Sequence, residues 1–342
     1  MANTASIAFS IATQATQPPL FNEDLSEIIY QVFRYGLIPC ISILGIAGNV
    51  ASIVILTRRG FRKCSNILLL ALSVSDILFL TGINNFPLFI YQETTPRGFR
   101  FSQNINYMFY ILYTTFLFAH NMGLHTAMII PVLITTERIL ALLSPLKALF
   151  ILTPPRTVIV LASLYVLNGF VFLYYFILCR ELKQYRIKGS VLGVFSHTEM
   201  YFAGVEAGVY GMIESIVNYM TGVIPISLVT MGCAVIGIQV VFITKKREQL
   251  ITGQIKTTPN TPISKTTKTL LSICVLYVLC SGFGFVLTYI ANTNLVENDE
   301  SLKKVLSSVQ DLLFCVNCVG DFVIYVGTRK STLRTRKSNL KK

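Results

Sequence analysis

Long uncharged runs of residues alternate with short charged segments along this chain. One such run covers residues 108–136, and a charged pair, Glu137 and Arg138, follows it directly. An apolar run of about 20 residues is long enough to cross the hydrocarbon of a bilayer as a helix. The pattern therefore predicts an all-α fold, a bundle of seven transmembrane helices at residues 37–56, 67–91, 108–136, 157–179, 216–244, 269–296 and 305–326.

Composition supports a membrane protein. Hydrophobic residues make up 53% of the chain and charged residues only 13%, whereas charged residues are about 25% of a typical soluble domain. The formal charge of +13 raises the question of a nucleic-acid partner. The basic residues gather in the loops on one side of the predicted bundle, so we expect no nucleic acid and a lipid bilayer as the surrounding partner.

The loop charges predict how the chain is oriented. Of the 29 Lys and Arg residues, 19 lie in the first, third and fifth connections and the C-terminal segment, and nine lie on the other side. Cytoplasmic loops are the ones enriched in Lys and Arg. We therefore expect a multi-pass protein of the plasma membrane, with its N-terminus outside and its C-terminus in the cytoplasm.

Several polar residues interrupt the predicted spans, and such residues are costly enough in a membrane to suggest function. They belong to four motifs, which are Gly48-Asn49, Leu72-Ser73-Val74-Ser75-Asp76, Glu137-Arg138-Ile139 and Asp321-Phe322-Val323-Ile324-Tyr325. In this order the motifs resemble the rhodopsin-like (class A) G-protein-coupled receptors over about residues 30–330. The resemblance implies an extracellular tail (1–27), a seven-transmembrane receptor domain (28–328) and a basic cytoplasmic tail (329–342).

The resemblance implies a polar network in the middle of the bundle. Its members would be Asn49, Asp76, Asn317 and Asp321. Two carboxylates facing each other in a low-dielectric core cannot both stay charged cheaply. They therefore imply a shared proton or a bound sodium ion at Asp76, and we expect no other cofactor. The simpler alternative for each residue alone is a hydrogen bond between packed helices.

The resemblance also places a coupling region on the cytoplasmic side. Arg138 would hold the inactive state through Glu137 and engage a heterotrimeric G protein once released. Further members of this region are Tyr325, Lys245, Lys246, Arg247, Lys265 and Lys268. Arrestin and receptor kinases are further expected partners. The alternative for the Glu137–Arg138 pair is a terminal anchor of the helix at the headgroups.

The resemblance implies that an extracellular ligand contacts the third and seventh helices, and helical spacing gives the depth of the residues there. His120 precedes Arg138 by 18 residues, or five turns, so both lie on one helix face about 27 Å apart. Asp311 lies ten residues, about 15 Å, from Asp321. The predicted pocket consists of His120, Asn121, Asn218, Thr221, Tyr289 and Asp311. His120 and Asp311 would pair when the pocket is empty, or they merely tether two helices.

The predicted ligand is a peptide or a small chemosensory molecule. His120 stands where the amine receptors of this family carry an aspartate, which argues against a monoamine. The turn at Pro145-Leu146-Lys147 and the divergent sixth helix resemble invertebrate, especially molluscan, peptide and chemosensory receptors.

The chain departs from the family pattern in several places. Tyr165 replaces a tryptophan, Ser281 and Phe283 replace the tryptophan and proline of the sixth helix, and Phe322 replaces the proline of the seventh. Tyr113 stands where the family has the cysteine of its extracellular disulfide, which leaves Cys179 without a partner. We expect the loop at 180–215 to be ordered by weaker contacts or to stay mobile.

Other classes of protein fit the sequence less well. The three histidines lack the spacing of a metal site, and no Ser-His-Asp order or Gly-rich phosphate loop is present, so we do not expect an enzyme. A transporter or channel would usually show internal repeats and interrupted helices. A receptor-like protein that no longer signals remains the main alternative, because the motifs of the sixth and seventh helices are altered.

Overall fold

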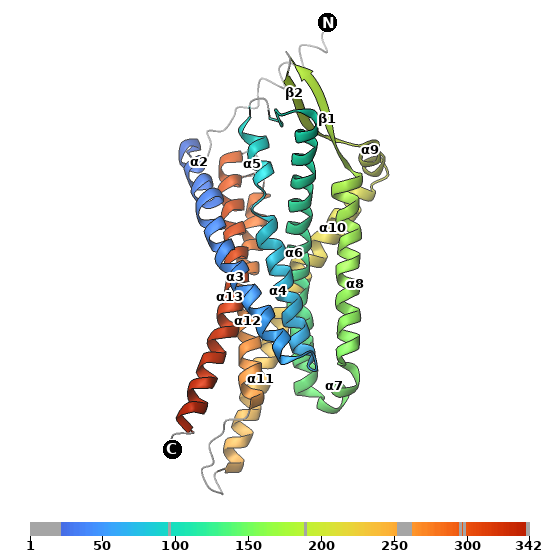
Figure 1. The fold of residues 1–342 in the computed structure, drawn as a ribbon. Helices are drawn as coiled ribbons and strands as arrows, with labels where there is room; N and C mark the ends of the chain where they lie inside the picture. The colour runs from blue at the N-terminus through green and yellow to red at the C-terminus, as the bar shows by residue number, and fades with distance from the viewer. Residues whose placement is uncertain are drawn as a thin grey trace.

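A computed structural model of the chain shows a bundle of long helices with a β-hairpin at one end (Figure 1). It describes residues 22–94, 97–187, 190–251, 262–293, 296 and 299–339, with only the backbone for parts of these, including 243–251, 262–268 and 328–339. Within these residues, seven helical segments are long and apolar enough to cross a membrane. The prediction of a seven-helix membrane bundle is confirmed.

Most spans consist of more than one helical element. The first span is α2 (Glu23–Gln31), η1 (Val32–Leu37) and α3 (Ile38–Arg59), the second is α4 (Cys64–Gly82) and α5 (Phe86–Glu93), and the third is α6 (Gln103–Leu143). The fourth is α8 (Pro154–Leu173) and η2 (Tyr174–Leu178), and the fifth is α10 (Val209–Asn218), η3 (Tyr219–Val223) and α11 (Ile224–Ile251). The last two are α12 (Pro262–Ala291) and α13 (Glu300–Asn339). A short helix, α7 (Pro145–Ile151), joins the third and fourth spans.

The first span begins at Glu23, inside the segment that we assigned to the extracellular tail (1–27). Asn22 caps α2, because its side-chain oxygen accepts hydrogen bonds from the backbone N–H groups of Asp24 and Leu25. Such a cap satisfies N–H groups that a helix start leaves free, and acidic residues in the first turn add to this. Likewise α13 continues through Asn339, beyond the predicted end at residue 326.

The second span is broken, although the sequence predicts one helix over 67–91. Here α4 ends at Gly82, and α5 begins at Phe86 with Asn85 as its cap and Pro87 in its first turn. Proline is favoured at the start of a helix and disfavoured inside one. The break opens a space beside the first span that is described below.

The core lies where α4, α6, α12 and α13 meet. Its fully buried side chains include Phe79, Ile130, Ile134 and Tyr277. Gly82 and Gly123 allow close contact between α4 and α6, because a Cβ atom on either would collide with the backbone of the other helix. Such close approach of helices is common in membranes, where small residues line the interfaces.

The loop at 180–215 is largely regular structure, which the sequence analysis did not predict. It contains an antiparallel hairpin of β1 (Arg180–Ile187) and β2 (Ser190–His197), followed by α9 (Glu199–Glu206) and the start of α10. The hairpin lies at the end of the bundle near α5 and the start of α6 (Figure 1). We call this end the N-terminal face, and the end that carries α7 the opposite face.

Aromatic stacking and several hydrogen bonds attach this hairpin to the bundle. The ring of Phe195 on β2 stacks against Tyr91 and Tyr113, with centroids 4.0 and 4.3 Å apart. Arg180 donates a hydrogen bond from Nη1 to the hydroxyl of Tyr113 at 3.0 Å. All eight cysteines are free, and burial raises the pKa of the Cys179 thiol. The loop is thus ordered by noncovalent contacts, as one of our two expectations stated.

Candidate functional site

Glu137 and Arg138 form a buried cluster with Ser65 at the opposite face. Nη2 of Arg138 contacts Oε2 of Glu137 at 2.9 Å, and both side chains are at least 86% buried. The same nitrogen donates to the Ser65 hydroxyl, which itself donates to Oε1 of Glu137 at 2.8 Å. Arg138 is therefore held against α4. Nothing in the sequence had marked Ser65, the second residue of α4.

The other residues predicted for coupling are described unequally. Tyr325 is buried on α13, and the guanidinium of Arg59 lies 5.9 Å from its ring centre. The basic side chains of α11 and α12 lie outside the described residues, although the backbone is helical there, and they are Lys245, Lys246, Arg247, Lys265 and Lys268.

The predicted polar network is assembled in the middle of the bundle. Asn49 donates from Nδ2 to the backbone carbonyls of Gly45 and Cys318, at 3.1 and 3.2 Å, which ties α3 to α13. Asp76 and Asp321 line a cavity of about 10 Å³ together with Asn49. Asn317 lies one turn before Asp321 and is also buried. All four predicted members therefore occupy one region.

The oxygens around this small cavity fit a bound cation. Neither carboxylate oxygen of Asp76 has a hydrogen-bond partner of standard geometry in the described part of the chain, and the weak thiol donor of Cys318 lies beside it. Oδ1 of Asp321 and Oδ1 of Asn317 likewise have no partner there. Buried oxygens without donors are costly, and a volume near 10 Å³ holds about one water-sized particle.

The structure contradicts the predicted pairing of His120 with Asp311. Oδ2 of Asp311 lies 3.4 Å from Nη1 of Arg34 on η1, so its partner is a cation of the first span. His120 instead packs on the ring of Phe79, with centroids 5.1 Å apart. Asn121 donates to the carbonyl of Leu117 in its own helix. These three predicted ligand residues do not share a pocket.

A larger cavity lies between α6, the fifth span, α12 and α13. Its volume is about 330 Å³, within the size range of small-molecule sites, and Asn218, Thr221 and Tyr289 belong to its wall as predicted. Its other polar lining residues are His125, Ser281, Thr288, Asn292 and Gln310. Tyr289 lies in the last turn of α12 and Asn292 directly follows this helix. The cavity therefore lies in the half of the bundle that is nearer to the N-terminal face.

His125 is the histidine of this cavity, and the sequence analysis had missed it. Its ring stacks on Phe172 of α8 at 4.8 Å, and its Nδ1 is buried without a partner in the described residues. It follows His120 by five residues, which turns it about 140° around the helix axis. A second histidine so near the first was the only signal available.

Two tyrosines tie helices together where the family pattern is altered. Tyr165 stands in place of the tryptophan, and its hydroxyl donates to the carbonyl of Ala71 at 2.9 Å and lies 2.6 Å from that of Ser75. On α12, Tyr277 donates to the carbonyl of Met128 on α6 at 3.1 Å. Both hydroxyls link separate spans in the core, where a hydrogen bond has no competition from bulk water.

The comparisons with known proteins agree with this architecture. A family model described as 7 transmembrane receptor (rhodopsin family) matches residues 48–325. The match runs from the first motif, Gly48-Asn49, to the last, which ends at Tyr325. No curated protein is significantly similar in sequence.

Proposed function

Because this chain belongs to the rhodopsin family of seven-transmembrane receptors, we propose that it binds an extracellular peptide or small chemosensory molecule and activates a heterotrimeric G protein. The family implies that the chain is a multi-pass membrane protein and a receptor with an extracellular ligand. The proposal adds the class of ligand, the plasma membrane as its location, and an N-terminus outside the cell.

The single observation that supports signalling most is the cluster around Arg138. A buried arginine that is held by a carboxylate and a hydroxyl is a group with two states, because it can exchange these partners for others. Arg138 lies 13 residues from His125 along α6, or about 20 Å. The ligand cavity lies against the middle of α6 and the cluster near its C-terminal end, so a shift of α6 would change both sites.

The cavity suggests how a ligand is recognised. Its polar side chains come from α6, the fifth span, α12 and α13, and its apolar walls include Phe285 and Phe314. A ligand that binds this cavity better in one arrangement of the spans shifts the population toward that arrangement. We place the ligand here, with His125, Asn218, Thr221 and Tyr289 as its polar contacts, and no longer at His120 and Asp311.

A sodium ion at Asp76 belongs to the proposal. Carboxylate and amide oxygens are the ligands that hard cations prefer, and Asp76, Asn317 and Asp321 offer such oxygens without hydrogen-bond partners. The ion would supply positive charge between the two carboxylates and so stabilise one packing of α4 against α13. Arrestin and receptor kinases are proposed as further cytoplasmic partners.

Substitution of Arg138 tests the signalling function. In cells that carry a promiscuous G protein, peptide and small-molecule libraries are screened for a response, and Arg138→Ala is then compared with Arg156→Ala. Arg156 is an exposed cation of the opposite face, and Nη1 of its guanidinium donates a hydrogen bond to the Phe150 carbonyl at 2.6 Å. We expect nucleotide exchange to fall at least tenfold in Arg138→Ala alone, with surface expression kept in both.

Two outcomes would contradict this proposal. Exchange that is unchanged in Arg138→Ala would remove Arg138 from coupling. If neither the wild type nor a variant with Arg138 released from Ser65 supports exchange under any condition, the chain is a receptor-like protein that does not signal.

A further inference from the structure

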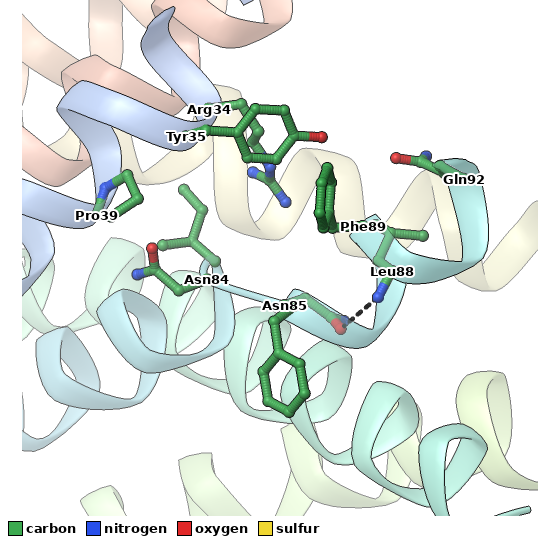
Figure 2. Close-up of a pocket in the computed structure, with 10 residues that line it drawn as sticks. Arg34, Tyr35, Pro39, Asn84, Asn85, Leu88, Phe89 and Gln92 are labelled. Atoms are coloured by element: carbon green, nitrogen blue, oxygen red, sulfur yellow. Dashed lines mark hydrogen bonds between the residues drawn. The ribbon is translucent and has the colours of Figure 1, made fainter. Parts of the chain in front are cut away.

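A second cavity, of about 200 Å³, lies between the first and second spans at the N-terminal face. It shares no lining residue with the larger cavity described above. Its walls come from η1 and α3 on one side, and from the break after α4 and from α5 on the other (Figure 2). The interruption of the second span is thus what shapes this site.

Arg34 is the one charged side chain that lines this cavity. Figure 2 shows the Arg34 side chain near Tyr35 and Phe89 at the wall of the cavity. A guanidinium carries five N–H donors, and in the described part of the chain Nη1 alone has a partner, Asp311 at 3.4 Å. The group therefore keeps donors for an anion.

The two asparagines that line the cavity already donate hydrogen bonds to backbone carbonyls of the protein. Asn84 donates to the carbonyl of Leu80 at 2.7 Å, and Asn85 donates to that of Tyr113 at 3.1 Å. Asn85 also accepts from the backbone of Leu88 as the cap of α5. Recognition of a polar group in this cavity thus falls to Arg34, with Gln92 as the remaining amide.

Most of the wall is apolar. Pro39, Leu88 and Phe89 contribute aliphatic and aromatic surface, and the rings of Tyr35 and Phe89 lie 4.7 Å apart at an angle of 64°. These two rings are also 42% and 39% exposed, so they lie at an open edge of the bundle. A cation and an apolar wall in one cavity fit a molecule with a charged head and an apolar body.

The depth of the cavity matches the border between hydrocarbon and headgroups. Arg34 precedes the apolar run at 37–56 by three residues, or about 4.5 Å, and Pro39 lies about 7.5 Å deeper. Arginine at such a level commonly reaches for the headgroup region. Beyond the cavity, Ile43 and Leu44 of α3 are exposed on the surface of the bundle, where an acyl chain can continue.

We propose that this cavity binds an anionic amphiphile, an acyl chain with a carboxylate or phosphate head, with the head on Arg34. A volume of 200 Å³ is below that of a drug-sized site, so it takes the head and the first carbons, and the rest of the chain lies along α3. The head competes with Asp311 for Arg34. Occupancy therefore loosens the ion pair between the first span and α13, whichever ligand fills the larger cavity.

The test uses the full chain in nanodiscs of neutral phosphatidylcholine. A dodecanoic acid that carries a photoreactive diazirine is crosslinked, and labelled peptides are identified by mass spectrometry. We expect label on η1, α3 or α5, and competition by dodecanoic acid at a concentration at least tenfold lower than by dodecanol. Equal competition by the alcohol, which has the same chain without the charge, would overturn the proposal.

Three variants test separately the contact of the charged head with Arg34 and the contact of the acyl chain with the apolar wall of the cavity. Arg34→Gln should weaken binding about tenfold, as expected for the loss of a hydrogen bond to a charged group. Leu88→Trp fills the cavity without touching the ion pair and should weaken binding as much. Arg97→Gln, an exposed arginine near the same face, should change nothing. If Arg34→Gln does not fold, Leu88→Trp decides, and unchanged labelling in that variant would overturn the proposal.

A last arm distinguishes the source of the amphiphile. Nanodiscs with anionic phosphatidylglycerol are compared with neutral ones. Weaker labelling in the anionic nanodiscs identifies a membrane lipid as an occupant, and equal labelling identifies the free acid. Either result supports the site, provided that labelling in both kinds of nanodisc depends on Arg34 and Leu88.

Discussion

Nη1 of Arg180 lies 3.0 Å from the hydroxyl of Tyr113, so the first residue of the hairpin is hydrogen-bonded to α6 at the position where the family has its disulfide cysteine. The stack of Phe195 on Tyr113 acts on the same ring. Together these contacts replace one covalent bond with several weaker ones.

Tyr113→Phe should therefore destabilise the hairpin while keeping the stack. A hydrogen bond with a charged donor contributes about 1.5–3 kcal/mol, and partial exposure of Arg180 puts the expected loss near the lower value. The measurement is the rate of limited proteolysis within the hairpin of detergent-solubilised protein. Tyr107→Phe serves as the control, because Tyr107 is an exposed tyrosine of the same helix whose ring lies against Tyr110. Equal proteolysis of all three proteins would show that the hydrogen bond between Arg180 and Tyr113 does not hold the hairpin.

Ser65→Ala should raise signalling without ligand. The change removes the hydroxyl that contacts both Glu137 and Arg138, so the state in which Arg138 is held against α4 loses about 1–2 kcal/mol. Such a loss raises the population of the released state about fivefold to thirtyfold. Basal nucleotide exchange measures this, with Thr136→Ala as the control, since Thr136 bonds only to the carbonyl of Val132. Basal exchange that stays at the wild-type level would separate Ser65 from activation.

Sodium should stabilise the wild-type protein, and Asp76→Asn should abolish the effect. In the variant the amide has no charge to attract the ion, and one of two buried carboxylates is gone. Thermal unfolding is compared in sodium chloride and in choline chloride at equal ionic strength. We expect a rise of a few degrees with sodium in the wild type alone. A rise of the same size in Asp76→Asn would mean that the ion binds elsewhere.

Tags at the two ends of the chain test the orientation. The excess of basic residues on one side predicts that a tag before Met1 is accessible on intact cells, and that one after Lys342 is accessible only after permeabilisation. Antibody staining of intact and permeabilised cells gives the result. The reverse pattern would place Arg138 outside and exclude coupling.

The sequence predicts the spans well because a length of apolar residues is a property of the segment itself. The ends depend on local bonds instead. The cap at Asn22 starts the first helix within a polar region. Asn85 and Pro87 break the second span, although the composition of that span is apolar. The hairpin was missed because β1 is mostly charged and polar and neither strand shows a regular alternation of apolar and polar residues.

For the candidate site, too, the sequence gives the position of a residue along its own helix but not its contacts with other helices. Motifs locate Asp76, Asp321 and Arg138, because each marks a position along its own helix. Helical spacing also gives the depth of a residue, and Thr221 and Tyr289, which the sequence places at matching depth, line one cavity in the structure. It does not give the partner across a helix boundary, so it could not show that Asp311 meets Arg34. Nor could it show which sector of α6 faces the cavity, that of His120 or that of His125.

The eight free cysteines have a consequence for how the protein matures in the cell. The hairpin needs no oxidation step to fold. Tyr113 attaches it to the bundle by a hydrogen bond with Arg180 and by stacking on Phe195, and neither contact needs an enzyme to form. The receptor should therefore reach its folded form in a cell-free translation mixture that contains thiol reductants. On the cell surface, a reducing environment that inactivates receptors with an extracellular disulfide should leave this one intact.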